Sequence, residues 1–246
     1  MQDRTAPFRL TTLLGGRRLG PLAPALERAL GLDRLDALCA RAEGGAAASP
    51  RAFVSRALAA LGVAPVVGAG DRARLPARGP ALVVANHPRG LLDGLLLLDL
   101  LLGLRPDVKL VANELLSSVA PLASVLVPVD TFAPAGAPEN VRALRAAHDW
   151  LAAGHVVALF PAGTVSHLQL RRLRVLDPVW SEAAAWLARR TGAPVVPAHL
   201  PGRNGALFQA AGLLHPRLRT ALLPRALARR AARRGSSWAG QDPASA

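Results

Sequence analysis

A histidine and an aspartate after an apolar run are the residues of this sequence best suited to acid–base chemistry. The segment reads Asn86-His87-Pro88-Arg89-Gly90-Leu91-Leu92-Asp93-Gly94. A carboxylate near a histidine fixes the imidazole tautomer and stabilises the imidazolium that forms when the ring accepts a proton. Because this pair includes no nucleophilic Ser or Cys, the attacking group would be a hydroxyl of the substrate. Considered alone, the pair is better explained as a loop histidine and a helix-capping aspartate.

A second candidate segment begins at the last residue of another apolar run, residues 155–160. It reads Phe160-Pro161-Ala162-Gly163-Thr164. A glycine lets the backbone approach a ligand closely, and N–H groups exposed there could hold an oxyanion or a phosphate. The alternative is a plain turn between a strand and a loop.

Short apolar runs alternate with helical stretches after residue 80, which is typical of an α/β fold with a mostly parallel central sheet flanked by helices. The predicted strands are 81–86, 108–112, 124–129, 155–160 and 194–199, and the predicted helices between them are 91–103, 137–153 and 179–191. Open α/β sheets place their sites at the carboxyl ends of strands, where His87 would lie. Asp93 would lie about one turn into the next helix and could fold back toward the imidazole.

Two further regions are predicted to be helical. From Leu22 to about Ala42, leucines recur at helical spacing, and a second helix is expected over 51–61. The first of these either packs on the core or lies on a membrane. Residues 225–234 are predicted to form an arginine-rich helix, followed by a disordered tail, 235–246.

Positive charge is distributed unevenly along the chain. Thirty Lys and Arg stand against 16 Asp and Glu, and ten arginines but no acidic residue lie between Glu182 and Asp242. This asymmetry indicates an anionic partner. We expect an anionic membrane surface rather than nucleic acid, because the chain has no Tyr and no aromatic residues interleaved with the arginines.

Several classes of protein are disfavoured. Cys39 is the only cysteine, and the histidines lack metal-ligand spacing, so we predict no metal site. No Gly-x-Ser-x-Gly elbow of a serine hydrolase is present.

The longest apolar stretch, 95–104, is too short to span a bilayer, and the N-terminus lacks the pattern of a secretory signal. We therefore expect a cytoplasmic protein, peripheral on the inner face of the cell membrane.

Four segments resemble, in order, the four blocks of the glycerolipid (lysophospholipid) acyltransferase family. They are Asn86-His87-Pro88 with Leu92-Asp93-Gly94, Val127-Pro128-Val129-Asp130, Phe160-Pro161-Ala162-Gly163-Thr164, and Val195-Val196-Pro197-Ala198 with Gly202-Arg203-Asn204. The resemblance covers about residues 50–230. It is closest to the hemolysin-like branch, which includes acyltransferases that complete ornithine lipids from lyso-ornithine lipid.

The resemblance implies a glycerolipid acyltransferase-like fold and transfer of a fatty acyl group from a thioester to a lysolipid hydroxyl. The thioester would be on acyl carrier protein or coenzyme A, with no additional cofactor. His87 would be the base and Asp93 its orienting partner. The substrate-binding candidates are Asn86, Arg89, Asp130, Phe160, Pro161, Ala162, Gly163, Thr164, Arg203 and Asn204. The expected domains are an N-terminal helical segment, 1–50, an acyltransferase domain, 51–234, and the tail.

The sequence also departs from the family pattern. Five residues separate His87 from Asp93, where the common pattern has four, and Ala162 replaces a glutamate. Thr131 and Val165 replace two arginines that the family is thought to use on an acceptor phosphate. Uncharged side chains cannot make charge-assisted phosphate contacts, which disfavours lysophosphatidate as the acceptor.

Several alternatives therefore remain. Other arginines could compensate for the two missing ones, the candidates being Arg89, Arg171, Arg172 and Arg174. The protein could then be a lysophosphatidate acyltransferase. It could also be a thioesterase, with water in place of the acceptor, or a non-catalytic lipid-surface protein that has kept the fold.

Overall fold

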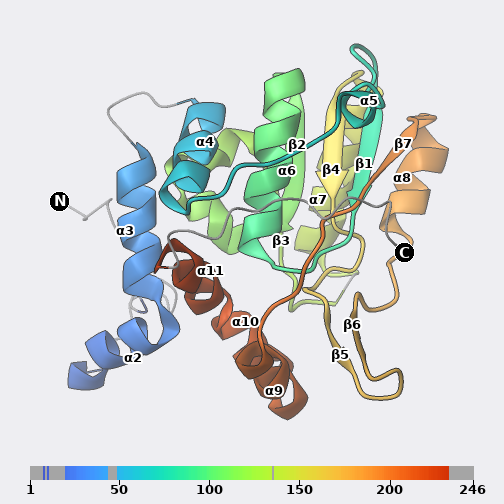
Figure 1. Cartoon of the computed structure of the whole chain (residues 1–246). Helices are drawn as coiled ribbons and strands as arrows, with labels where there is room; N and C mark the ends of the chain where they lie inside the picture. The colour runs from blue at the N-terminus through green and yellow to red at the C-terminus, as the bar shows by residue number, and fades with distance from the viewer. Residues whose placement is uncertain (1–7, 9, 11–19, 44–48, 135, 233–246) are drawn as a thin grey trace.

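A five-stranded parallel sheet forms the centre of the molecule in the computed structural model, which describes residues 8, 10, 20–43, 49–134 and 136–232, without the side chains of 228–232. The strand order is β3-β2-β4-β1-β7 (Figure 1). The strands are β1 (Ala81–Ala85), β2 (Val108–Asn113), β3 (Leu126–Val129), β4 (Val156–Leu159) and β7 (Val195–Ala198). The predicted α/β fold with its parallel sheet is confirmed.

The two central strands, β1 and β4, are fully buried because helices cover both faces of the sheet. Successive side chains of a strand point to opposite faces, so alternate residues enter two different cores. One core joins β1 to α4 (Pro50–Ala60) and α6 (Leu91–Leu104). The other joins β1 to α7 (Pro138–Ala152) and α8 (Ala183–Thr191).

The predicted boundaries need two corrections near the sheet. Residues 124 and 125 belong to a 3-10 helix, η3 (Ala120–Val125), and not to β3, because Pro121 favours the first turn of a helix. Helix α8 begins four residues after the predicted position of 179. A second 3-10 helix, η2 (Glu114–Ser118), follows β2, and the one-turn helix α5 (Ala69–Arg72) precedes β1.

The leucine-rich segment near the N-terminus forms two helices where the sequence predicted one. After the 3-10 turn η1 (Gly20–Leu22), α2 (Ala23–Leu30) ends at Gly31, whose φ of 74° no helix interior adopts, and α3 (Leu32–Glu43) follows. The buried side of α3 packs in the same core as α4 and α6. Leu22 and Leu26, by contrast, are exposed.

The C-terminal half contains elements that the sequence did not predict. A two-stranded antiparallel hairpin, β5 (His167–Gln169) and β6 (Arg174–Leu176), follows β4, and α9 (Ala206–Leu214) and α10 (Pro216–Ala221) follow β7. The hairpin, α9 and α10 lie together on the lower side of the sheet (Figure 1). The predicted arginine-rich helix is α11 (Leu223–Ala232), and the predicted tail lies outside the described residues.

Candidate active site

The structure brings His87 and Asp93 together at the carboxyl end of β1. His87 lies two residues after the end of that strand, and Asp93 lies in the first turn of α6. Nδ1 of His87 is 3.0 Å from Oδ2 of Asp93, with 18% of the histidine side chain and 1% of the aspartate side chain exposed. The two atoms are within hydrogen-bonding distance but are not aligned for a hydrogen bond. Poor alignment is common in catalytic pairs before substrate binds.

The Asp93 carboxylate also caps α6. Its Oδ2 accepts the backbone N–H groups of Arg89, at 2.7 Å, and of Gly90, at 2.9 Å. Its other oxygen, Oδ1, is buried with no hydrogen-bond partner among the described residues. Asp93 therefore combines the two roles that the sequence left as alternatives, capping the helix and contacting the histidine.

Gly90 allows the five-residue spacing between the two side chains to close. Its φ is 76°, in the left-handed region that favours glycine. A Cβ placed there would lie 2.7 Å from Cδ2 of Leu223 and 3.2 Å from Cγ2 of Val165. The longer spacing therefore does not separate His87 from Asp93 in this chain.

The His87 ring and backbone are held by elements distant in the sequence. The ring stacks on Phe160, with centroids 4.0 Å apart and an interplanar angle of 20°. The His87 carbonyl accepts the Ser166 N–H at 2.8 Å, and its N–H donates to Asp177 Oδ1 at 3.3 Å. Asp177 also accepts the Ser166 hydroxyl and the indole N–H of Trp180. No motif in the sequence marks Ser166 or Asp177.

The first and fourth blocks meet next to the pair. Asn86 donates to the Leu200 carbonyl at 2.8 Å and accepts the Leu200 N–H at 2.7 Å, so both ends of its amide bind within the protein. Asn204 donates to the Pro88 carbonyl at 3.4 Å. These contacts fasten the turn after β1 to the segment after β7.

The arginines that the sequence suggested for substrate binding lie in different environments. The Arg89 guanidinium packs against Gly202, where an added Cβ would lie only 2.0 Å from its Nη2. Arg203 is exposed in the segment after β7. The three remaining candidates are exposed on or beside the β5–β6 hairpin and are Arg171, Arg172 and Arg174.

The third block forms an open turn beside the histidine. The Gly163 N–H donates to the Phe160 carbonyl at 3.0 Å, so this N–H is engaged in the turn and is not a free anion donor. Gly163 has a φ of 64°, and nothing lies within 4 Å of the position of an added Cβ. Pro161 accepts a backbone bond from Ser181, while Ala162 is partly exposed. The Thr164 hydroxyl accepts a hydrogen bond from Arg219 Nη2 at 3.2 Å.

The second block lies farther along the same edge of the sheet. Asp130 follows β3, which β2 and β4 separate from β1 by about 14 Å at ordinary strand spacing. Its Oδ1 accepts the Phe132 N–H at 2.8 Å, and its backbone exchanges two bonds with Asn140. Asp130 therefore supports its own turn, and within the described ranges it makes no salt bridge.

The two positions that lack the family arginines hold uncharged side chains with internal contacts. Thr131 is exposed, and its hydroxyl accepts a hydrogen bond from Asn113 at 2.8 Å. Val165 is buried beneath the turn at Gly90. Neither position contributes a positive charge to the site.

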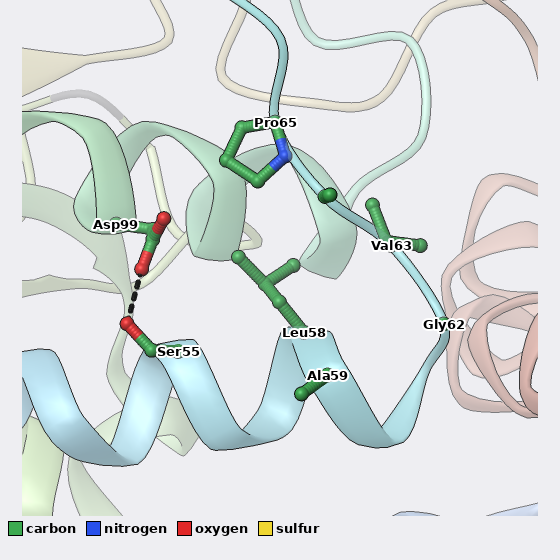
Figure 2. Close-up of a pocket in the computed structure, with 8 residues that line it drawn as sticks. Ser55, Leu58, Ala59, Gly62, Val63, Pro65 and Asp99 are labelled. Carbon is green, nitrogen blue, oxygen red and sulfur yellow. Dashed lines mark hydrogen bonds between the residues drawn. The ribbon is translucent and has the colours of Figure 1, made fainter. Parts of the chain in front are cut away.

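A hollow of about 350 Å³ lies elsewhere, between the second half of α4, the segment 62–65 that follows it and Asp99 in the middle of α6 (Figure 2). Ser55 donates its hydroxyl proton to Asp99 at this place. Asp99 lies six residues beyond Asp93 in α6, roughly 9 Å along the helix axis. The hollow is therefore separate from the histidine–aspartate pair.

Among the described residues, no group of three or more His, Cys, Asp or Glu side chains could hold a metal ion. None of the helices in this part of the chain combines the length and apolarity needed to cross a bilayer.

The fold and the site together define an α/β protein with a partly exposed histidine next to a buried aspartate at the carboxyl edge of a parallel sheet. A protein-family model described as Acyltransferase matches residues 45–221. The chain belongs to this acyltransferase family, as the four blocks indicated.

Two curated relatives are lyso-glycine lipid O-acyltransferases. The protein of Phocaeicola vulgatus is 30% identical over 138 residues, which cover 54% of this chain and 46% of the relative. That of Bacteroides thetaiotaomicron is 32% identical over 138 residues, covering 54% and 47%. The chain spans about half the length of the curated relatives it matches.

Proposed function

We propose that this protein transfers a fatty acyl group from a thioester to a hydroxyl of a lysolipid. The supporting observation is the 3.0 Å contact between His87 and Asp93, in a family of acyltransferases. Asp93 lies at Nδ1, so Nε2 of His87 removes the proton of the acceptor hydroxyl. The hydroxyl oxygen then attacks the thioester carbonyl, the carbon–sulfur bond breaks, and the thiolate leaves with the proton.

The buried Asp93 carboxylate orients the imidazole and stabilises the imidazolium during this step. Phe160 holds the ring from one face. The exposed turn at Gly163 leaves room for the reacting groups beside the ring. Asn86 of the first block and Asn204 of the fourth block shape the site by fastening its backbone.

The acceptor that we propose is a lysolipid with an amino-acid head group rather than a bare phosphomonoester. Thr131 and Val165 leave the two arginine positions of the family uncharged. The named relatives act on lyso-glycine lipid, and the hemolysin-like resemblance points to lyso-ornithine lipid. Both names describe amino-acid lipids.

The donor is an acyl thioester on acyl carrier protein or on coenzyme A. The ten arginines between Glu182 and Asp242, in a stretch without acidic residues, give this part of the chain a positive charge. An acidic carrier protein would be attracted to such a surface.

We also propose that the protein binds to an anionic membrane surface. The exposed apolar residues of the hairpin, α9 and α10 include Leu170, Leu173, Leu213, Leu214 and Leu218. The exposed arginines 171, 172, 174 and 217 accompany them. These elements lie on the same side of the sheet (Figure 1). Leucines with basic neighbours are the combination that binds the interface of anionic lipid, consistent with a peripheral location on the inner membrane face.

Vesicle sedimentation tests the membrane surface. The double variant Leu170→Ser/Leu173→Ser is expected to lose most binding to vesicles with anionic lipid. The control, Val66→Ser/Leu104→Ser, changes two equally apolar exposed residues outside this surface and should bind as the wild type does. Equal binding by both double variants would refute this docking surface.

A transfer assay with purified protein tests the enzymatic function. Wild-type protein receives a labelled acyl thioester and, in separate reactions, lyso-glycine lipid, lyso-ornithine lipid or lysophosphatidate. We expect acylation of an amino-acid lysolipid in preference to lysophosphatidate. Preference for lysophosphatidate would refute the proposed acceptor. Release of free fatty acid at a rate that does not depend on added lysolipid would indicate a thioesterase. The absence of any turnover would favour a non-catalytic lipid-surface protein.

A further inference from the structure

Arg219, in α10, is a buried arginine without a counter-charge among the described residues. Only 5% of the residue is exposed. One guanidinium nitrogen, Nη2, donates to the Thr164 hydroxyl at 3.2 Å, while Nε is buried with no hydrogen-bond partner in this part of the chain. Desolvation by burial lowers the pKa of Arg219 from its ordinary value. The fold therefore leaves this charge without full compensation.

Arg105, the other buried arginine among the described residues, shows what full compensation requires. It is equally buried, yet Asp107 accepts from two of its nitrogens. Three backbone carbonyls accept its remaining hydrogen bonds. A buried charge is costly unless it is paired and hydrogen-bonded in this way. Arg219, unlike Arg105, therefore has an N–H group, on Nε, that is left to bind a ligand.

The guanidinium borders the loop that holds the histidine. Thr164 is two residues before Ser166, whose N–H donates to the His87 carbonyl at 2.8 Å. Gly163, next to Thr164, is exposed and open on the side where a Cβ would lie. The Thr164 hydroxyl that Arg219 contacts therefore lies one residue from the exposed Gly163.

Two neighbours define the surroundings of the Arg219 side chain. A Cβ added to Gly212 of α9 would lie 3.0 Å from Cδ of Arg219, so the glycine makes room for the side chain. His167 lies within its electrostatic reach, since burial and, second, the charge of Arg219 lower the pKa of that imidazole. The surroundings of Arg219 thus favour a negative ligand over another positive group.

We propose that Arg219 and Thr164 form an oxyanion-binding subsite for a carboxylate or phosphate of the substrates. The inference rests on the proposed function and adds a residue that determines substrate recognition. A guanidinium presents a planar fork that matches a carboxylate or phosphate bidentately. Arg219 would supply the positive charge that Thr131 and Val165 do not. The oxyanion is either the head-group carboxylate of an amino-acid lysolipid or a phosphate of the thioester donor.

Steady-state kinetics in neutral detergent micelles tests the subsite and distinguishes the two sources. The enzymes are wild type, Arg219→Gln, Arg219→Lys, and Arg145→Gln as an exposed control on α7, outside the proposed membrane surface. The acceptor is an N-(β-hydroxyacyl)glycine, offered with a free carboxylate and as its methyl ester. KM is measured for each acceptor and for the acyl thioester donor, and thermal melting confirms that each variant is folded.

For an acceptor carboxylate, Arg219→Gln is expected to raise the KM of the free acid about 10- to 100-fold, the range of a lost charge-assisted contact. The KM of the ester would be unchanged, and Arg219→Lys would fall between the wild type and Arg219→Gln. For a donor phosphate, the KM of the thioester would rise instead. A folded Arg219→Gln variant with both KM values within about twofold of wild type would overturn the subsite.

The subsite and the proposed function can fail separately. A wild-type protein without transfer activity would refute the function. The subsite would then be judged by equilibrium binding of the free-acid lipid and of the thioester to wild type and to Arg219→Gln. Equal affinity of the two proteins for both ligands would refute it. If Arg219→Gln does not fold, Arg219→Lys replaces it in every comparison, since the lysine keeps the charge but loses the planar fork.

Discussion

The polar contacts of Asp93 converge on one oxygen, and this makes Asp93→Asn a sharp test of its charge. Oδ2 accepts two backbone N–H groups and lies 3.0 Å from His87 Nδ1, whereas Oδ1 has no hydrogen-bond partner among the described residues. An asparagine can place its carbonyl oxygen where Oδ2 lies. Its amide nitrogen then takes the place of Oδ1. The geometry is kept and only the negative charge is removed.

The expected change in stability is small because two effects oppose each other. Each backbone hydrogen bond loses about 1 kcal/mol when its acceptor becomes neutral. The folded state, however, no longer buries a carboxylate, which costs several kcal/mol. We expect the free energy of unfolding to stay within about 2 kcal/mol of wild type. Asp93→Ala has the same relief but leaves both N–H groups unpaired at roughly 1–3 kcal/mol each, so it should be about 2–6 kcal/mol less stable than Asp93→Asn.

The expected change in activity is large. The amide oxygen of the new asparagine still faces Nδ1, but it carries no negative charge, so the imidazolium that forms on His87 loses its stabilisation. Acyl transfer by Asp93→Asn should fall roughly 10²- to 10⁴-fold, or about 3–5 kcal/mol in the activation free energy. Urea unfolding and kcat of the two variants are measured side by side. An Asp93→Asn enzyme within about threefold of the wild-type rate would refute the reasoning.

Three further predictions concern the surroundings of the site and the core. Gly90→Ala, with a Cβ 2.7 Å from a leucine methyl and a φ of 76°, should lower stability by about 1–3 kcal/mol in urea unfolding and reduce activity, unlike Gly70→Ala, where no atom lies within 4 Å. Burial raises the pKa of the Cys39 thiol to about 12, so iodoacetamide at pH 8 should alkylate the unfolded protein and spare the folded one. The hydrogen bond from Arg105 lowers the pKa of Asp107 from 3.8 to about 2, a contribution to stability of about 2 kcal/mol that is present above the unfolded value and lost as the pH falls through about 2. Acid unfolding monitored by circular dichroism should therefore be shallower below pH 4 in Asp107→Asn.

The sheet could be predicted from the sequence because its strands are continuous apolar runs bounded by turn residues. Residues 81–85 are all buried, as expected of a strand with helices on both faces. The family blocks identified His87 and Asp93, since the order of four short motifs is far more specific than any one of them. The short distance between them depends on the turn 86–90, which connects β1 to α6 and contains Gly90.

The hairpin and the C-terminal helices were missed for physical reasons. Strands β5 and β6 have three residues each, too few to show alternation. Their turn contains no Gly, Asn or Asp, and Leu173 adopts the left-handed φ of 49° instead. Nothing in the sequence separates Arg219 from the other arginines, because its burial arises only when α10 packs against α9. Asp177 is likewise defined by contacts with residues far away in the chain.

The rate of acyl transfer by His87→Ala, compared with His148→Ala, tests the central claim most directly. His148 is a matched control, since its Nδ1 is also 3.0 Å from a carboxylate oxygen, of Asp149, but that carboxylate is 79% exposed. Purified proteins are given a labelled acyl thioester and an amino-acid lysolipid, and the acylated product is quantified. The account predicts at least a roughly 10²-fold loss for His87→Ala and a wild-type rate for His148→Ala. Full transfer by a folded His87→Ala protein would contradict it.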